Sequence, residues 1–237
     1  MRNCVWKRRS VAGWPLAAAF AVLCGFGIGA PAYGDDEAPE GMVQLELDLP
    51  SPSYSGSPFD FSSPRLEPMT WARRENPYVP EGTVNLALNR PLTASAEPRY
   101  NALEDIVNGE KAYDTESVVE LPSGPQWIQI DLEQEASIYA VVLWHFFESE
   151  RVYFDVVVAV SNDPEFEEDV HVLYNNDYEN RHGLGEGEDY QYVETHEGRL
   201  IDAEGVQARY VRFYSNGNNW DARNHYIEAE VYGLPAA

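Results

Sequence analysis

Hydrophobic and polar residues in the larger, C-terminal part of the chain follow the patterns of short β-strands. In the segment 126–132 apolar residues alternate with other residues, which places Ile128, Ile130 and Leu132 on one side of a strand. Further strands are expected at 138–147, 152–160, 170–174, 209–214 and 225–232. The first two of these are nearly all apolar, which predicts central strands buried on both faces. Turn sequences separate the runs, so the pattern predicts an all-β antiparallel sandwich over residues 84–235.

The beginning of the chain has a different pattern. Four basic residues precede an apolar stretch, and Ala30-Pro31-Ala32 follows as an A-x-A cleavage sequence. This order is typical of a secretory signal peptide, so we expect a leader over 1–34 and an exported mature chain. A membrane anchor, or lipid attachment at Cys24, is the alternative. Cleavage would remove both cysteines, Cys4 and Cys24, which leaves no disulfide and no cysteine metal ligand.

Residues 35–83 fit neither pattern. Stretches such as 49–58 are rich in Pro, Ser and Gly, which is typical of an extended linker without a core of its own. Large apolar residues are nevertheless frequent in this part of the chain: Phe59, Phe61, Met69, Trp71 and Tyr78. We therefore expect a disordered Pro/Ser-rich linker over 35–83, with some of these side chains against the folded domain. A short peptide that binds another envelope protein is the alternative.

The charge of the chain bears on its partners. It has 40 acidic and 16 basic residues and a net charge of −24, and loss of the leader would make this charge more negative. Phosphate backbones and anionic lipid headgroups are bound mainly through basic side chains. The composition therefore argues against nucleic acid and against an anionic membrane as partners. Neutral glycans, divalent cations and basic surfaces stay open.

Four motifs in register resemble discoidin domains, also called coagulation factor 5/8 type C domains. They are Asn85-Leu-Ala-Leu-Asn-Arg-Pro91, Trp127-Ile-Gln-Ile-Asp-Leu132, Ala208-Arg-Tyr-Val-Arg212 and Ile227-Glu-Ala-Glu-Val-Tyr-Gly233. The sequence is also similar to bacterial secreted discoidin-domain proteins and to family 32 carbohydrate-binding modules. This resemblance implies a galactose-binding-like fold, which is an antiparallel jelly-roll β-sandwich with ligand loops at one end.

The same resemblance implies one structural calcium ion. In the family modules the ion is held by an early loop and by a glutamate of the final strand. Here Asn108-Gly109 matches the loop and Glu228 the glutamate, and Asp114 and Thr115 would supply further oxygens. Calcium prefers six to eight oxygen ligands, and Asn108 replaces the usual aspartate. The alternative is a type I′ turn at Asn108-Gly109 with Glu228 on the surface.

The sequence contains no recognisable catalytic arrangement. The five histidines lack the H-E-x-x-H spacing of a zinc site, and no G-x-S-x-G sequence is present. A glycosidase-like carboxylate pair can be neither supported nor refuted among 40 acids. The acidic runs 163–169 and 186–189 are interpreted as solvated loops, with weak calcium binding as the alternative. We predict that the protein is not an enzyme, with an unrecognised glycoside hydrolase as the lesser possibility.

The loop 216–225 combines the side chains that bind sugars. Aromatic faces stack on the apolar side of a sugar ring, and amide, guanidinium and imidazole groups bind its hydroxyls. The predicted ligand-binding residues are Trp220, Asn218, Asn219, Arg223 and His225, joined by His145 and Arg151 from the turn between the two long strands. The alternatives for His145 and Arg151 are a strand-end hydrogen bond and a salt bridge.

These observations predict a secreted, noncatalytic module that binds carbohydrate or another extracellular polymer through loops at one end of the sandwich. The alternative is a protein-interaction or envelope-assembly domain.

Overall fold

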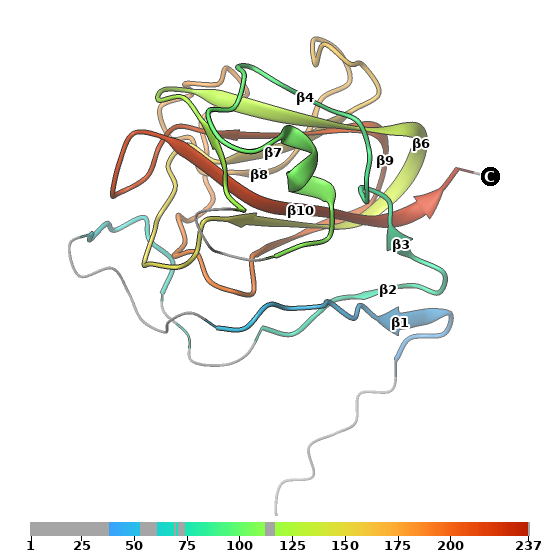
Figure 1. The fold of residues 1–237 in the computed structure, drawn as a ribbon. Coiled ribbons are helices and arrows are strands. Elements are labelled where there is room, and N and C mark those ends of the chain that lie inside the picture. Colours follow the sequence, from blue (N-terminus) through green and yellow to red (C-terminus); the bar gives the residue numbers. More distant parts are fainter. Residues whose placement is uncertain (1–37, 53–60, 69, 71–73, 112–116, 237) are drawn as a thin grey trace, which may run out of the picture. The chain divides into compact units, whose positions relative to one another are not determined.

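The computed structural model describes residues 38–52, 61–68, 70, 74–111 and 117–236. Its strands are β1 (Met42–Gln44), β2 (Tyr78–Pro80), β3 (Val84–Asn85), β4 (Leu92–Ala94), β5 (Val119–Leu121), β6 (Gln126–His145), β7 (Val157–Ser161), β8 (His171–Asn175), β9 (Arg199–Ser215) and β10 (Asn224–Pro235). A short 3-10 helix, η1 (Leu103–Val107), lies between β4 and β5 (Figure 1). The predicted leader 1–34 falls outside the described residues. Within them, no helix is long and apolar enough to cross a bilayer.

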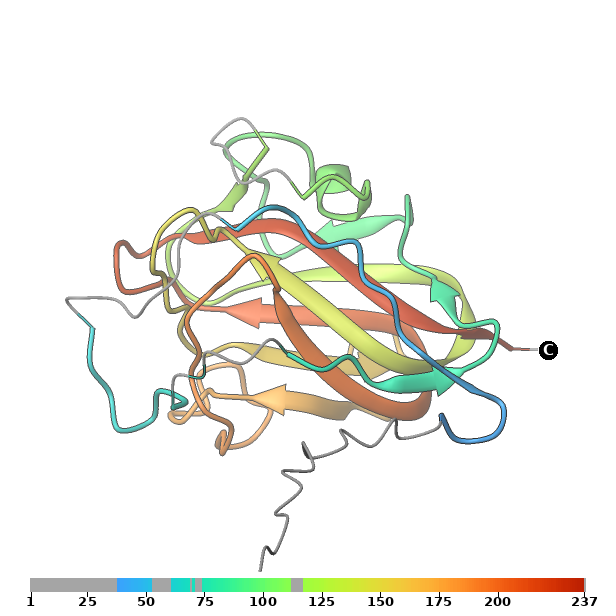
Figure 2. The ribbon, with the colours of Figure 1, turned by 90° about the horizontal axis from the view of Figure 1, so that it is seen from below.

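Two long strands, β6 and β9, connect the layers of the sandwich (Figures 1 and 2). The first part of β6 pairs with β4 and with the end of β9, whereas its second part pairs with β10 and with the beginning of β9. The β6–β9 ladder is interrupted after Asp131 and again after Ile138. Glu133, Glu204 and Gly205 have positive φ angles near these interruptions. Such irregularities bend and twist strands, so one hydrogen-bonded sheet folds over into two layers.

The order of the main sheet is β3-β10-β6-β9-β7-β8, and the pairings are antiparallel. The all-β antiparallel sandwich predicted from the sequence is therefore confirmed. One detail differs. The strands expected at 126–132 and 138–147 are two parts of one bent strand, because β6 continues through the polar residues between them.

Alternation along the strands builds the core between the layers. Ile128, Ile130 and Leu132 of β6 are buried as the pattern predicted, and they pack with Val211 and Phe213 of β9. Full burial of such a side chain contributes about 1.5–3 kcal/mol. The second part of β6 is buried on both faces, as its sequence also predicted. Another part of the chain must therefore pack against the outer face of this part of β6.

Part of the expected linker provides this cover, and here the structure differs from the prediction of a disordered 35–83. β1 and β2 form an antiparallel ribbon. Leu45 and Val79 are only 6% and 2% exposed and join a second apolar cluster with Val142, Trp144 and Ile227 on the outer face of β6 and β10. The strands of the ribbon are three residues long and lie among prolines, so they carry too little periodicity to be recognised from sequence.

A second part of this segment also contacts the sandwich. The ring of Phe61 lies 5.6 Å from that of Phe154, centroid to centroid, and Leu66 forms a parallel bridge with Gln191. Tyr78 lies in β2. The expectation that some of the large apolar residues lie against the domain is thus met for Phe61. Phe59, Met69 and Trp71 fall outside the described residues.

We expect Leu45→Ala to lower the free energy of unfolding by about 2 kcal/mol, because it removes buried methyl groups from the cover of β6. Val43→Ala is the matched control, since Val43 is in the same ribbon but 44% exposed. Urea titration of both variants measures the difference. If Leu45→Ala leaves the urea midpoint unchanged, the segment does not stabilise the domain.

Candidate functional site

The loop between β9 and β10 is held by the side chain of Asn218. Its Oδ1 accepts hydrogen bonds from the backbone N–H groups of Trp220 (2.9 Å) and Asp221 (3.2 Å). Its Nδ2 donates to the carbonyl of Arg223 (3.0 Å) and to Oδ1 of Asp221 (3.2 Å). These four bonds use the hydrogen-bonding capacity of the amide. Asn218, predicted to bind ligand, therefore shapes the loop, as short polar side chains in turns commonly do.

Asn219, the second predicted amide ligand, ties the loop to the segment that follows β6. Its Oδ1 accepts from the backbone N–H of Val152 (2.8 Å), and its Nδ2 donates to the carbonyl of Glu150 (3.3 Å). An antiparallel bridge between Tyr153 and Asn218 continues this contact. Two loops distant in sequence thereby become neighbours at the end of the sandwich where β10 begins.

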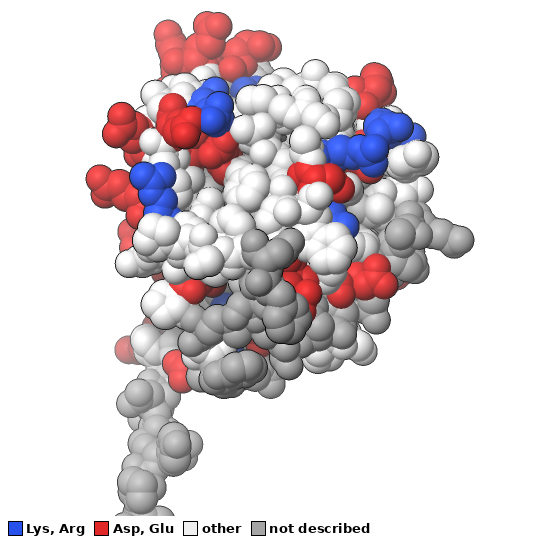
Figure 3. All heavy atoms as spheres, turned by 90° about the vertical axis from the view of Figure 1, so that its left-hand side faces the viewer, with Lys and Arg blue, Asp and Glu red and all other residues white. Residues whose placement is uncertain are grey.

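An exposed aromatic ring lies beside a cation at this end. Trp220 is 56% exposed, the highest fraction among the described tryptophans. The guanidinium carbon of Arg151 lies 5.6 Å from the centroid of the Trp220 ring and 4.6 Å from that of Phe146. Figure 3 faces this end and shows a largely uncharged surface with separate groups of basic and acidic side chains around it. The structure thus brings together Trp220 and Arg151, as the sequence predicted.

His225 lies at the edge of this surface and is mostly buried. Its Nε2 lies 3.3 Å from Oε2 of Glu120, and its Nδ1 faces Nη1 of Arg151 (3.2 Å) and the hydroxyl of Tyr153 (3.1 Å). Burial and, next, the charge of Arg151 lower the pKa of His225. These partners assign a neutral ring that donates from Nε2 and accepts at Nδ1.

Glu120 pairs with further basic side chains at this end of the sandwich. Its carboxylate pairs with Nη1 of Arg223 (3.1 Å) and with Nη1 of Arg99 (3.3 Å), in addition to His225. Sequence reasoning predicted Arg223 but missed Arg99 and Glu120. Glu120 lies opposite His225 because β5 pairs with β10. No local sequence pattern predicts a pairing between strands about a hundred residues apart.

His145 differs from its predicted place on the ligand surface. It is 0% exposed, and its Nδ1 lies 2.6 Å from Oε1 of Glu194, which is also fully buried. Its ring stacks on Tyr153 at 4.2 Å between centroids. The pleat at the end of β6 turns this side chain inward, so direct contact with a ligand is precluded in this conformation. His145 instead supports Tyr153, whose hydroxyl reaches His225.

Of the four predicted calcium residues, the structure describes Asn108 and Glu228, whereas Asp114 and Thr115 are outside the described residues. Oε1 of Glu228 accepts a hydrogen bond from the backbone N–H of Gly109 (3.1 Å). Asn108 has a φ of −88°, which differs from a type I′ turn. Glu228 is 0% exposed, so it is not a surface residue either. The structure therefore differs from the alternative of a type I′ turn with Glu228 on the surface.

The chemistry of Glu228 suits a cation. Its Oε2 is buried and has no hydrogen-bond partner among the described residues. Burial raises the pKa of this carboxyl to about 9, because the charged form is poorly solvated. Lys111, which pairs with Glu230 at 2.8 Å, is the nearby basic side chain. In the described part of the chain, no group of three or more His, Cys, Asp or Glu side chains could hold a metal ion. The unpartnered oxygen fits a calcium ligand, and the remaining donors would be backbone and loop oxygens.

Comparison with known proteins finds similar solved structures. No family model matches the chain, and no curated protein matches it. A chitosan-binding module from a Paenibacillus chitosanase/glucanase is similar, with a TM-score of 0.45 and 22% identity over 63% of this chain and 99% of that one. A fucose-binding module from Streptococcus pneumoniae gives a TM-score of 0.44 and 18% identity over 63% and 97%. The names of these two neighbours describe a chitosan-binding and a fucose-binding module.

A family 89 glycoside hydrolase from Clostridium perfringens is also similar, with a TM-score of 0.48 and 18% identity. The match covers 65% of this chain but only 15% of that enzyme.

Proposed function

We propose that this protein is an exported, noncatalytic module that binds carbohydrate at the end of the sandwich where β10 begins. The observation that carries the proposal is the exposed ring of Trp220 in a loop whose backbone is fixed by Asn218. Large aromatic side chains are normally buried. An exposed one on a rigid loop offers a flat apolar face at a small entropic cost on binding.

Polar groups around this ring would bind the sugar hydroxyls. Arg151 contacts the Trp220 ring, and Arg223 is held nearby by Glu120. Guanidinium groups donate in the ring plane, which suits hydroxyls and acetal oxygens at the rim of a stacked sugar. Asn218, Asn219 and His145 support this surface from behind, as their hydrogen bonds indicate.

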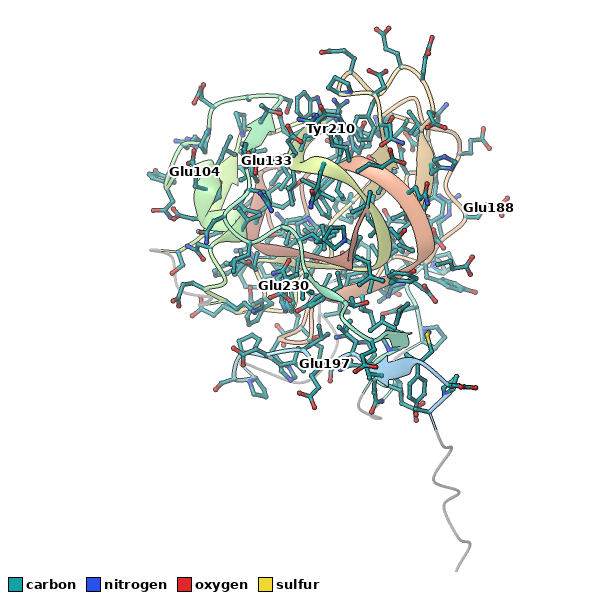
Figure 4. All side chains as sticks on the ribbon, turned by 90° about the vertical axis from the view of Figure 1, so that its right-hand side faces the viewer. Glu104, Glu133, Glu188, Glu197, Tyr210 and Glu230 are labelled. Carbon is teal, nitrogen blue, oxygen red and sulfur yellow. The ribbon has the colours of Figure 1, made fainter. Side chains whose placement is uncertain are left out.

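We expect Trp220→Ala to weaken binding of the glycan ligand at least tenfold, since a stacked aromatic is among the larger single contributions at a binding site. A glycan array with the wild-type protein identifies the ligand, and calorimetry with that ligand measures the loss. Tyr210→Ala is the matched control: Arg209 lies over the Tyr210 ring at 5.1 Å, and Tyr210 is at the opposite end of the sandwich (Figure 4). The site is wrong if the Trp220 variant binds as the wild type does, and the function is wrong if the array shows no binding.

We also propose that Glu228 and the loop after Asn108 hold one structural calcium ion. The support is the buried carboxylate oxygen that lacks a partner in the described residues. A bound calcium would supply the positive charge that this oxygen lacks and would join β10 to the loop after η1. Its role would be stability, because Glu228 is not among the residues around Trp220.

A further inference from the structure

We infer that the ligand of this surface is an acidic sugar, a uronic acid whose carboxylate pairs with Arg151 while its ring stacks on Trp220. This inference rests on the proposed function and adds the chemical class of the ligand.

Arg151 lies among uncharged partners in an acidic chain. Several other partly exposed arginines pair with carboxylates, as Arg90 does with Glu133 and Arg209 with Asp131. No carboxylate of the described residues lies within ion-pair distance of Arg151. Its hydrogen-bond partners are Oγ of Ser149 (3.3 Å) and Nδ1 of His225 (3.2 Å), and both are neutral groups. The charge of Arg151 is therefore left without a counterion.

Two acids near His225 are engaged by other groups. Glu120 pairs with Arg99, Arg223 and His225. Oδ1 of Asp221 accepts hydrogen bonds within its own loop, from Nδ2 of Asn218 and the backbone N–H of Arg223. Neither carboxylate is positioned to neutralise Arg151. An anionic group of a ligand would supply the counterion that Arg151 lacks among the described residues.

The guanidinium is also held in a fixed orientation. Its carbon lies near the rings of both Phe146 and Trp220, and two hydrogen bonds hold one edge. A guanidinium has five N–H groups, so others remain available. A carboxylate fits such an edge with two parallel hydrogen bonds, and pre-orientation reduces the entropy lost on binding.

The dimensions suit a pyranose uronic acid. Its carboxylate is attached directly to the sugar ring, so the ring and the charge are neighbours in the ligand. The Trp220 ring and the Arg151 guanidinium, 5.6 Å apart, are neighbours in the same way. The negative charge of the whole chain does not prevent this pairing, since exposed charges are largely screened beyond a Debye length of about 8 Å at physiological salt.

The test compares ligands that differ only in charge. Oligosaccharides of galacturonate, glucuronate, mannuronate and guluronate are each titrated beside their methyl esters and their carboxyl-reduced neutral forms. We expect one acid to bind at least about tenfold more tightly than its ester and its neutral form. This comparison leaves the protein unaltered, so it does not depend on the folding of a variant.

Arg151→Gln should then abolish the preference for the acid, whereas Arg209→Gln, an arginine over an aromatic ring at the opposite end, should retain it. Thermal midpoints confirm that both variants are folded. Equal binding of acid and ester, or a preference that survives Arg151→Gln, would overturn the inference and leave carbohydrate binding intact. Failure of every acid, ester and neutral sugar to bind would overturn the proposed function as well.

Discussion

In calcium-free solution, the titration of Glu228 should lower the free energy of unfolding as the pH rises from about 5 to about 8, with a contribution of about 1.4 kcal/mol per pH unit. The cause is Glu228, whose pKa is raised from 4.5 to about 9 by burial. The folded protein then keeps a proton that the unfolded chain loses above 4.5. A group with a raised folded pKa stabilises fully below its unfolded value, and that stability is lost as the pH rises towards the folded value.

Glu228→Gln should remove this slope, because an amide does not titrate and still accepts the hydrogen bond from Gly109. Glu133→Gln, an exposed glutamate paired with Arg90, is the control that should leave the slope unchanged (Figure 4). Urea titrations at several pH values, with a chelator present, measure all three proteins. A wild-type slope that persists in Glu228→Gln would show that other groups cause it.

Calcium should act on the same carboxyl. If the ion binds Glu228, it favours the ionised form, so added calcium should raise the thermal midpoint of the wild type most at the higher pH. Glu228→Gln should lose most of this response. An unchanged midpoint of the wild type in calcium and in chelator would remove the calcium proposal and leave the pH prediction standing.

Trp144→Ala should lower the free energy of unfolding by about 3–5 kcal/mol. Trp144 is fully buried in the outer cluster of β6, and its Nε1 donates to the carbonyl of His196 at 3.0 Å. Its ring lies so close to Gly198 that a side chain there would meet it at 2.6 Å. Removal of the ring leaves a cavity between β6 and the N-terminal cover, together with an unpaired carbonyl.

Trp220→Ala is the chemically identical control, and it should change stability by less than about 0.5 kcal/mol because the ring is exposed. The two substitutions should have opposite profiles: Trp144→Ala loses stability and retains binding under folding conditions, whereas Trp220→Ala retains stability and loses binding. Chemical denaturation and calorimetry on the same preparations test this. Equal losses of stability would contradict the assignment of one ring to the core and the other to the surface.

Strands in which apolar and polar residues alternate clearly were predictable, because this alternation is a local property of the sequence. Ile128, Ile130 and Leu132 point to one side whatever the rest of the chain does, and the structure buries all three. The short ribbon of β1 and β2 was not predictable in this way. Its burial depends on Leu45 and Val79 reaching the outer face of β6, which only exists once the sheet has formed.

The same distinction applies to the candidate site. The loop with Trp220 was recognisable, since it is polar and contains a tryptophan without apolar neighbours. The roles of the single residues in this loop were not recognisable from sequence. Asn218 and Asn219 have structural roles because their side-chain amides form hydrogen bonds with backbone groups. Glu120 and Arg99 joined the site through strand pairing that no local signal encodes.

The sequence by itself determined that residues 84–235 form an antiparallel all-β sandwich, since strand periodicity and turn residues are local properties of the chain. It also placed Trp220 and Arg151 in loops. Only the tertiary structure decided that Arg151 lies beside Trp220 without a carboxylate partner among the described residues, that His145 is buried and that Glu228 is sealed from solvent. Burial, pKa and ion pairing depend on which distant segments become neighbours, and that is settled by how the whole chain packs.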